Sequence, residues 1–336
     1  MIIKQDISLL PYNTFGIDAK ADYFVEYCSI EDLQTALLSE IVKLNKIFHI
    51  GGGSNLLFLN DYKGVILHSA IKFIEIINED TDYVFIKVGS GIVWDDFVMY
   101  AVENGWCGIE NLSLIPGEVG AAAVQNIGAY GVEVQDSIVK VNAVEISTAL
   151  QKTFSVADCN YGYRESIFKN ELNTKYIITS VEFRLKKKPI FKLNYQHLEE
   201  EVLKSGEVNL KNIRSTIIDI RKSKLPDTNV FGNAGSFFMN PVITKELFNE
   251  LQNQYPQIPH YFVSDAEEKV PAGWLIDQCG WKGKQLGNAA VHDKQALVLI
   301  NKGGAKGQEI VYLAQQIQAS VKSKFGIELH AEVNYI

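Results

Sequence analysis

The sequence has few cysteines and no long apolar run. Its 336 residues include four widely spaced cysteines and no C-x-x-C pair, which argues against a disulfide framework and against a zinc knuckle. No stretch approaches the roughly 18 apolar residues of a membrane span. The start, MIIKQDISLLPYN, lacks the apolar core of a signal peptide. We therefore expect a protein of the reducing cytoplasm that does not enter a membrane.

Histidine and positive charge are also scarce. The six histidines show no paired metal-ligand spacing, and no H-E-x-x-H or EF-hand pattern occurs, so we predict no metal site. The 32 Lys and Arg residues against 40 Asp and Glu give a net charge of −8 at pH 7. Such a molecule repels nucleic-acid phosphates. We expect no nucleic-acid partner, and any anionic ligand needs a local basic pocket.

The remaining composition is that of an ordinary globular protein, with 47% hydrophobic and 21% charged residues. At about 150 residues per domain, the length suggests two or three domains. Strand and helix patterns alternate, and residues 139–185 are mostly strand. The long antiparallel stretches favour an α+β fold over a doubly wound parallel sheet.

Hydrophobic periodicity predicts the main elements. Ser29 starts a helix that continues to about Leu44, and the amphipathic stretch 93–104 ends at Gly105, which is typical of a glycine C-cap. Further elements are a polar helix in 196–220, helices at 245–254 and 308–325, and a closing strand at 329–336.

The first of two glycine-rich segments is GGGSN, residues 51–55, which follows a predicted strand. Its three glycines let successive backbone N–H groups turn toward one point, as in an anion nest that suits a pyrophosphate. A tight glycine turn between strands explains the motif equally well. No G-K-[ST] follows, and Leu56 replaces the third glycine of the Rossmann fingerprint. A Walker loop and an NAD-binding Rossmann domain are therefore disfavoured.

The second segment, residues 115–131, reads IPGEVGAAAVQNIGAYG and carries almost no charge. It has too many glycines to predict a stable helix and is too apolar for an exposed loop. Gln125 and Asn126 offer uncharged hydrogen-bonding groups among residues small enough for a flat isoalloxazine ring to lie against the backbone. Taken alone, the segment is more simply interpreted as a close-packed loop in the core.

Three other residues are candidates for chemistry. Arg164 lies in YGYRESIFK, where a guanidinium among apolar residues is costly unless it meets an anion, although a structural salt bridge is the commoner explanation. Ser236 in GNAGSFFMNP has no G-x-S-x-G elbow, so a hydrolase is weakly supported, but the hydroxyl could deliver a proton. Glu332 lies on the polar face of the closing strand and becomes functional only if that face lines a cleft.

The order and wording of these motifs resemble one family, the UDP-N-acetylenolpyruvoylglucosamine reductases, flavoenzymes of bacterial cell-wall precursor synthesis. The matching segments span almost the whole chain: YNTFGI, GGGSN, IPGEVGAAAVQNIGAYG, YGYRESIFK, KLPD, GNAGSFFMNP, PAGWLIDQCG, AAVHDKQALVLIN and LHAEVNYI. The resemblance implies non-covalent FAD, NADPH as hydride donor, and reduction of UDP-N-acetylglucosamine enolpyruvate to UDP-N-acetylmuramate.

The resemblance also implies the domain layout. An FAD-binding domain of the vanillyl-alcohol-oxidase type would comprise two α+β subdomains. These would be residues 1–68, completed by the terminal strand 327–336, and residues 69–225. A C-terminal α+β substrate-binding domain would follow at 226–326.

Family roles can be carried onto matching positions. Arg164 and Glu332 would flank the enolpyruvyl group and polarise its carboxylate, while Ser236 would be the general acid. FAD contacts are implied for Gly51, Gly52, Gly53, Ser54, Asn55, Gly117, Gly120, Gln125, Asn126, Gly128, Ala129 and Arg221. Substrate contacts are implied for Tyr195, Lys224, Asn240 and Gln295.

Three details qualify these roles. Tyr195 lies in FKLNYQHLEEE, where one subtype of the family carries a tyrosine loop that closes over the UDP part. Met239 stands where many relatives have Lys, and Asn334 where several have Arg. These two departures put a phosphate or ribose contact at each place in question, whereas the hydride and proton chemistry depends on neither.

Two other interpretations stay open on the sequence. A flavin oxidase of the same architecture explains the FAD motifs but gives no reason for GNAGSFFMNP or for Glu332. A nucleotide-sugar or dinucleotide sensor would bind through the glycine segments without turnover. The oligomeric state cannot be inferred, and no residue visibly reads the 2′-phosphate that distinguishes NADPH from NADH.

Overall fold

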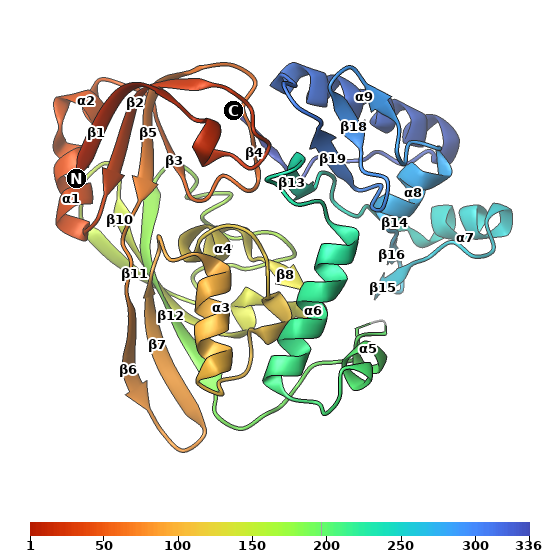
Figure 1. The fold of residues 1–336 in the computed structure, drawn as a ribbon, viewed down its shortest axis with the longest axis horizontal. Coiled ribbons are helices and arrows are strands. Elements are labelled where there is room, and N and C mark those ends of the chain that lie inside the picture. Colours follow the sequence, from red (N-terminus) through yellow and green to blue (C-terminus); the bar gives the residue numbers. More distant parts are fainter. Residues whose placement is uncertain (196) are drawn as a thin grey trace. The chain divides into compact units, whose positions relative to one another are not determined.

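The structure is a computed structural model that describes residues 1–195 and 197–336. The chain forms two compact units (Figure 1). The first unit contains residues 1–7, 21–52 and 62–223, and the second contains residues 8–20, 53–61 and 224–336. Short stretches of the N-terminal part therefore belong to the second unit.

The first unit is built on two sheets and a small hairpin. Its strands are β1 (Ile2–Ser8), β2 (Lys20–Tyr27), β3 (Ile47–Ile50), β5 (Tyr62–Ser69), β6 (Ile74–Glu79), β7 (Tyr83–Gly89), β8 (Gly128–Ala129), β9 (Val132–Glu133), β10 (Ile138–Glu145), β11 (Gln151–Ser155) and β12 (Tyr176–Lys186). One sheet has the order β1-β2-β5-β3, with β5 parallel to β2 and β3. The other is antiparallel, with the order β11-β10-β12-β7-β6.

The first unit also contains helices. They are α1 (Ile30–Leu38), α2 (Glu40–Lys43), α3 (Trp94–Glu103), α4 (Val119–Gln125), α5 (Leu198–Lys204) and α6 (Leu210–Lys224), with the 3₁₀ turns η2 (Glu110–Leu112) and η3 (Val134–Asp136). Trp94 and Phe97 of α3 and Ala123 of α4 are fully buried in one core with Val181 and Phe183 of β12. This core fixes α3 and α4 beside the antiparallel sheet (Figure 1).

The second unit contains shorter strands and three helices among its described residues. Its elements are η1 (Leu10–Tyr12), β4 (Leu56–Leu57), β13 (Gly232–Ser236), β14 (Val242–Thr244), α7 (Lys245–Gln254), β15 (Tyr261–Ser264), β16 (Glu267–Lys269), α8 (Ala272–Gln278), β17 (Gln285–Leu286), β18 (Ala289–Val291), β19 (Val298–Asn301), α9 (Gly307–Phe325) and β20 (Asn334–Tyr335). The sheets have the orders β13-β19-β18-β17 and β14-β16-β15, and β20 pairs with β4 in parallel.

Most predicted helices are confirmed. α7 has the expected bounds. The stripe predicted for 308–325 is buried in α9, and Gly326 ends this helix with φ +70°, a conformation that glycine adopts without steric cost. The amphipathic stretch that contains α3 ends at Gly105, with φ +77°. The predicted polar region 196–220 forms two helices, α5 and α6, apart from Gln196, which lies outside the described residues.

The glycine-rich segment 115–131 is a correction, because α4 is a helix where none was predicted. Glycine propensity is local, but the first turn of α4 is held by distant backbone. Val119 N–H donates to the Ile92 carbonyl (2.9 Å), and Gly120 N–H donates to the Ser90 carbonyl (3.0 Å). Burial of Val119 and Ala123 adds apolar packing, so tertiary contacts override the propensity.

Two other expectations were wrong in extent. The helix expected from Ser29 to Leu44 breaks at Ser39, whose extended backbone ends α1 and whose hydroxyl accepts from Val42 N–H to begin α2. The closing strand is reduced to Asn334–Tyr335, with an isolated bridge at Ala331. The short partner β4 has only two residues, so a longer parallel ladder cannot form.

The described helices also bear on the membrane question. Within residues 1–195 and 197–336, no helix is long and apolar enough to cross a membrane. In the same residues, no three His, Cys, Asp or Glu side chains lie together in a way that could hold a metal ion.

Candidate active site

The two glycine-rich segments meet in the first unit. A Cβ at Gly52 would lie 3.3 Å from the Cα of Gly117, and a Cβ at Gly51 would lie 3.1 Å from the Cβ of Ala121. The missing side chains therefore allow two backbones to approach closely. Gly120 continues this packing, because its Cβ would lie 2.8 Å from the Cβ of Ser90.

Gly53, by contrast, belongs to the second unit and packs against the backbone of Tyr12. It has φ +63°, and a Cβ there would lie 2.0 Å from the Tyr12 carbonyl oxygen, so only glycine fits. Ser54 follows it, and Asn55 then donates from its amide to the Glu332 carbonyl (3.1 Å). The predicted motif 51–55 thus contributes residues to both units.

Two buried polar atoms test whether the first unit fits a flavin. Among the described residues, Gln125 Oε1, at the end of α4, and Arg221 Nε, in the last turn of α6, are buried without a hydrogen-bond partner. Unpaired buried polar groups are rare and costly. An acceptor matches the ring N–H of an isoalloxazine, and a guanidinium matches a phosphate. Together with the glycine contacts, these residues fit FAD.

Arg221 and Lys224 supply positive charge at the end of α6. They are three residues apart and therefore lie on neighbouring positions of one helix face. Lys224 is exposed, whereas Arg221 is half-buried, and burial lowers the pKa of Arg221. The local basic group that the net charge of −8 required is available here.

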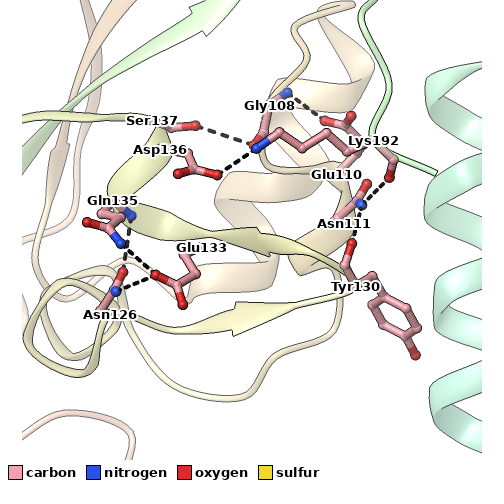
Figure 2. Close-up of polar contacts among 10 residues, drawn as sticks. All are labelled: Gly108, Glu110, Asn111, Asn126, Tyr130, Glu133, Gln135, Asp136, Ser137 and Lys192. Atoms are coloured by element: carbon pink, nitrogen blue, oxygen red, sulfur yellow. Dashed lines mark hydrogen bonds and ion pairs between the residues drawn. The ribbon is translucent and has the colours of Figure 1, made fainter. Parts of the chain in front are cut away.

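The hairpin β8–β9 carries Gly128 and Ala129 beside Asn126. Asn126 is fully buried and donates both amide hydrogens to protein acceptors, Glu133 Oε2 (2.8 Å) and the Gly162 carbonyl (2.8 Å). Figure 2 shows this amide facing Glu133. Both side-chain donors of Asn126, which the family resemblance implies as a flavin contact, are therefore bonded to acceptors within the protein.

Arg164 reaches the same hairpin. Its guanidinium donates to the Gly128 carbonyl (2.5 Å) and to the Asn126 carbonyl (3.4 Å), and its Cζ lies 5.3 Å from the centre of the Tyr163 ring. The structure thus brings three predicted site residues, Gly128, Asn126 and Arg164, into contact.

Tyr195 packs at the tip of the hairpin. Its ring meets the Tyr130 ring edge-on with centroids 5.9 Å apart, and a Cβ at Gly131 would lie 3.7 Å from the Tyr195 Cβ. Figure 2 shows the Tyr130 backbone carbonyl accepting from Asn111, which also donates to the Lys192 carbonyl. The Tyr195 segment therefore contacts the hairpin turn directly at Tyr130 and Gly131 and is linked to it through Asn111.

In the second unit, Ser236 and Glu332 become neighbours. Glu332 N–H donates to the carbonyl of Phe237 (2.8 Å), the residue after Ser236. Phe238 bridges to Ala331 in an antiparallel arrangement, and Gly235 before the serine has φ +67°. Ser236 is exposed at the end of β13. A hydroxyl and a carboxyl group from distant parts of the sequence thus lie on adjoining backbone.

The other predicted substrate residues gather at α8. Asn240 Oδ1 accepts from Ala272 N–H at the first residue of this helix (2.9 Å), and a Cβ at Gly273 would lie 3.1 Å from Gln295 Oε1. Of the two departures, Met239 donates its N–H to the His330 carbonyl (2.9 Å), while Asn334 donates its amide to the Asn55 carbonyl (3.3 Å).

Sequence reasoning missed the residues that support this site. Lys169, Glu133 and Gln135 contact the backbone or side chain of Arg164 or Asn126. Lys169 was visible as the last residue of YGYRESIFK, where a cation five residues after the arginine was a signal without an assigned role. His68 and Glu118 form a further hydrogen bond (3.1 Å), and nothing in their spacing indicated it.

Comparisons with known proteins agree with this architecture. Residues 21–151 match the family described as FAD binding domain, and residues 226–336 match the family described as UDP-N-acetylenolpyruvoylglucosamine reductase, C-terminal domain. The structure of UDP-N-acetylenolpyruvylglucosamine reductase from Thermus caldophilus is similar, with a TM-score of 0.71 at 22% identity, covering 100% of this chain and 99% of that one.

A wider likeness concerns the fold alone. A structure of 6-hydroxy-D-nicotine oxidase from Arthrobacter nicotinovorans has a TM-score of 0.56 at 13% identity and covers 97% of this chain and 86% of that one. The predicted fold class is confirmed: an α+β chain with an FAD-binding domain of the vanillyl-alcohol-oxidase type and a C-terminal α+β domain.

Curated relatives extend the match to full length. The UDP-N-acetylenolpyruvoylglucosamine reductase of Bacteroides fragilis is 53% identical over 334 residues, which is 99% of this chain and 100% of the relative. That of Porphyromonas gingivalis is 50% identical over 338 residues, with both chains covered completely. At this identity and coverage, the chain belongs to the UDP-N-acetylenolpyruvoylglucosamine reductase family.

Proposed function

We propose that this chain is an FAD-dependent oxidoreductase that uses NADPH to reduce UDP-N-acetylglucosamine enolpyruvate to UDP-N-acetylmuramate. The reaction would serve cytoplasmic synthesis of peptidoglycan precursors. Family membership supports the reaction class. The structural observation that supports the proposal is the hydrogen bond from the Glu332 backbone N–H to the Phe237 carbonyl, because it joins the segment that carries the proposed acid Ser236 to the segment that carries Glu332.

FAD, when bound, would supply the hydride chemistry that links the nicotinamide to the methylene carbon of the enolpyruvyl ether, and the glycine segments, Gln125 and Arg221 would hold it. The chain's own residues then manage charge and protons. Arg164 would face the substrate carboxylate, where enolate charge develops, and stabilise it. Ser236 would protonate the neighbouring carbon. A serine hydroxyl is a weak acid, so this role requires a strongly basic enolate, and Glu332 would assist in its protonated form.

Binding would fall to the remaining predicted residues. The glycine contacts of residues 51–53, 117 and 120 suit a pyrophosphate and a flat ring, with Gln125 as ring acceptor and Arg221 toward the FAD phosphates. Lys224, Asn240 and Gln295 would hold the sugar nucleotide, and Tyr195 would close over its UDP part. The predicted subdomain boundaries, 1–68 with 327–336, 69–225 and 226–326, belong to this proposal.

The decisive experiment follows the flavin absorbance of purified protein, first with anaerobic NADPH and then with UDP-N-acetylglucosamine enolpyruvate. Flavin bands that bleach with NADPH and return on adding the sugar nucleotide support both half-reactions. Bands that return only with oxygen would favour an oxidase. Nucleotide binding without bleaching would favour a sensor, and protein that binds no FAD in excess cofactor would overturn the proposal.

A further inference from the structure

Arg164 lies in an unfavourable backbone conformation. Gly162 and Glu165 exchange two backbone hydrogen bonds of 3.1 Å, one in each direction, and Arg164 is the third residue of the tight turn that they close. Its φ is +59°. A turn position with positive φ is normally filled by glycine or asparagine. A non-glycine residue keeps such a conformation only where its surroundings enforce it.

Lys169 supplies one of these restraints. Its Nζ donates to the backbone carbonyl of Arg164 (2.9 Å), and the side chain is half-buried. Its backbone N–H donates to the Ser166 carbonyl (3.1 Å). The buried Ser166 hydroxyl in turn donates to the carbonyl of Val124 in α4 (2.6 Å). The ammonium group thus ties the peptide after Arg164 to a segment anchored on α4.

Asn126 supplies a second restraint from the other side. It ends α4 with φ +44°, a left-handed conformation that asparagine tolerates. Its amide donates to the Gly162 carbonyl (2.8 Å), at the start of the turn, and its own carbonyl accepts from Arg164 Nη1 (3.4 Å). One residue therefore contacts both the turn that carries Arg164 and the guanidinium at the end of its side chain.

The Asn126 amide is itself held in place. Its Nδ2 donates to Glu133 Oε2 (2.8 Å), and its Oδ1 accepts from Gln135 N–H (3.2 Å). The Gln135 side chain donates to the same Glu133 oxygen (2.6 Å). Figure 2 shows the three side chains gathered around this oxygen. Because both amide hydrogens are used, the side chain is fixed in orientation and acts through its neighbours.

We propose that Lys169 and Asn126 are positioning residues for Arg164. Lys169 holds the left-handed peptide, and Asn126 links the turn to the hairpin that receives the guanidinium. Neither side chain contacts substrate in this role. The inference rests on the proposed function, because it takes Arg164 to stabilise charge on the substrate carboxylate. That charge develops only when reduced FAD is reoxidised by substrate, so reduction of FAD by NADPH should be less affected.

A double-mutant cycle tests the role of Lys169. Lys169→Met removes the donor at similar length, and we expect it to slow anaerobic single-turnover reoxidation of reduced FAD by the enolpyruvyl substrate by about 10- to 100-fold, the cost of slight misplacement of a catalytic group. Lys169→Arg, which keeps a donor, should recover the rate to within about threefold. Residues that act through one another are non-additive. In an Arg164→Lys background, Lys169→Met should therefore cost less than about threefold.

Controls separate positioning from general damage. Lys175→Met replaces an exposed lysine of the same loop region and should leave the rate unchanged. Each variant is checked for a native flavin spectrum and urea midpoint. Asn126→Gly keeps the left-handed conformation and removes the amide, so it should show the same non-additivity with Arg164→Lys. If Asn126→Gly does not fold, the Lys169 cycle decides the proposal.

Several outcomes would overturn this inference. Equal losses from Lys169→Met in both backgrounds would mean that Lys169 acts independently of Arg164. If Arg164→Lys reoxidised its reduced FAD as fast as wild type, Arg164 would have no role in this step that Lys169 and Asn126 could support. Failure of the wild-type protein to oxidise its reduced FAD with the substrate is a different result, because it removes the proposed function before any variant is compared.

Discussion

At the scale of single residues, His68 of β5 connects Glu26 of β2 with Glu118, the residue that precedes α4. Its Nδ1 meets Glu26 Oε2 and its Nε2 meets Glu118 Oε1, both at 3.1 Å. Burial disfavours the imidazolium, but the hydrogen bonds to Glu118 and Glu26 outweigh burial and raise the pKa of His68. Glu118 Oε2 lies 3.2 Å from the Cβ position of Gly51, so a charged His68 steadies a carboxylate that borders the proposed cofactor site.

The stability that His68 confers should depend on pH. Because its folded pKa is raised above the unfolded value of about 6.5, its contribution is fully present below that value and is lost as pH rises through the folded pKa. We expect His68→Gln to lower the free energy of unfolding by about 1.5–3 kcal/mol at pH 5.5, the range for hydrogen bonds to charged groups. The loss at pH 9 should be smaller.

Urea unfolding at the two pH values measures this difference. Neighbouring His49 should not affect the comparison between wild type and variant. Burial lowers the pKa of His49 to about 3, so folded His49 stays neutral at both pH values. His330→Gln, at an exposed histidine, is the matched control and should show no pH-dependent loss. An equal loss for His68→Gln at both pH values would contradict the imidazolium bridge.

Ser236 carries the sharpest prediction for chemistry. If its hydroxyl protonates the substrate carbon, Ser236→Ala should lower kcat by about 10²- to 10⁴-fold, the usual range for a lost general acid, while FAD remains bound. Steady-state turnover and the flavin spectrum measure the two effects. Ser320→Ala on α9, whose hydroxyl donates to the Gln316 carbonyl of the same helix, should behave as wild type. Near-normal turnover of Ser236→Ala would remove the acid role.

At the scale of elements, sequence patterns predicted what neighbours along the chain decide. α7 and α9 follow from periodicity, caps and the glycine at position 326. α4 could not be predicted in this way, because residues 90–92 satisfy the first N–H groups of its turn and nothing local records that contact. The truncated closing strand has the same cause, since its length is set by β4, almost 280 residues away in the chain.

In the candidate site, too, the sequence predicted which residues take part but not the long-range contacts between them. The resemblance to the family predicted Arg164, Ser236 and Glu332 as a set, but periodicity and spacing could not show that the backbone of Phe237, next to Ser236, bonds to Glu332. The supporting contacts were equally hidden. Lys169 donates a hydrogen bond to a backbone carbonyl oxygen. Every residue type has such an oxygen, so the sequence could not indicate which residue is the partner.

Gly120 tests the packing of α4 as an element. An alanine would improve helix propensity by up to about 1 kcal/mol, but its Cβ would lie 2.8 Å from the Cβ and 3.3 Å from the carbonyl oxygen of Ser90. Overpacking of this kind typically costs about 1–3 kcal/mol. We therefore expect Gly120→Ala to lower the free energy of unfolding and to weaken FAD binding, as measured by urea unfolding and FAD titration.

Gly162→Ala provides the comparison for stability. A Cβ there would meet no atom nearer than the Glu165 Cβ at 3.8 Å, an ordinary van der Waals distance, so its free energy of unfolding should stay close to that of wild type. If Gly120→Ala were as stable as wild type, the contact between α4 and residues 89–91 would be looser than the structure indicates.

At the scale of the whole molecule, an acidic chain must bind anionic cofactors. The net charge of −8 repels FAD, NADPH and a sugar nucleotide at long range, so affinity must come from local groups. Arg221 and Lys224 provide cations, and glycines at 51 and 52 let the backbone approach residues 117–121 closely with no side chain between them. This arrangement predicts that the pyrophosphate of FAD contributes more to binding than the ring alone.

Thermal unfolding of protein stripped of flavin tests that prediction. A ligand that binds only the folded state at 100 times its Kd adds about 2.7 kcal/mol of stability, so FAD should raise Tm in a concentration-dependent manner. FMN carries the same ring but only one phosphate and no adenosine. At equal concentration it should raise Tm much less, because it cannot bridge the glycine segments as a pyrophosphate does. Equal shifts from FMN and FAD would mean that these segments do not hold a pyrophosphate and that their glycines serve backbone packing alone.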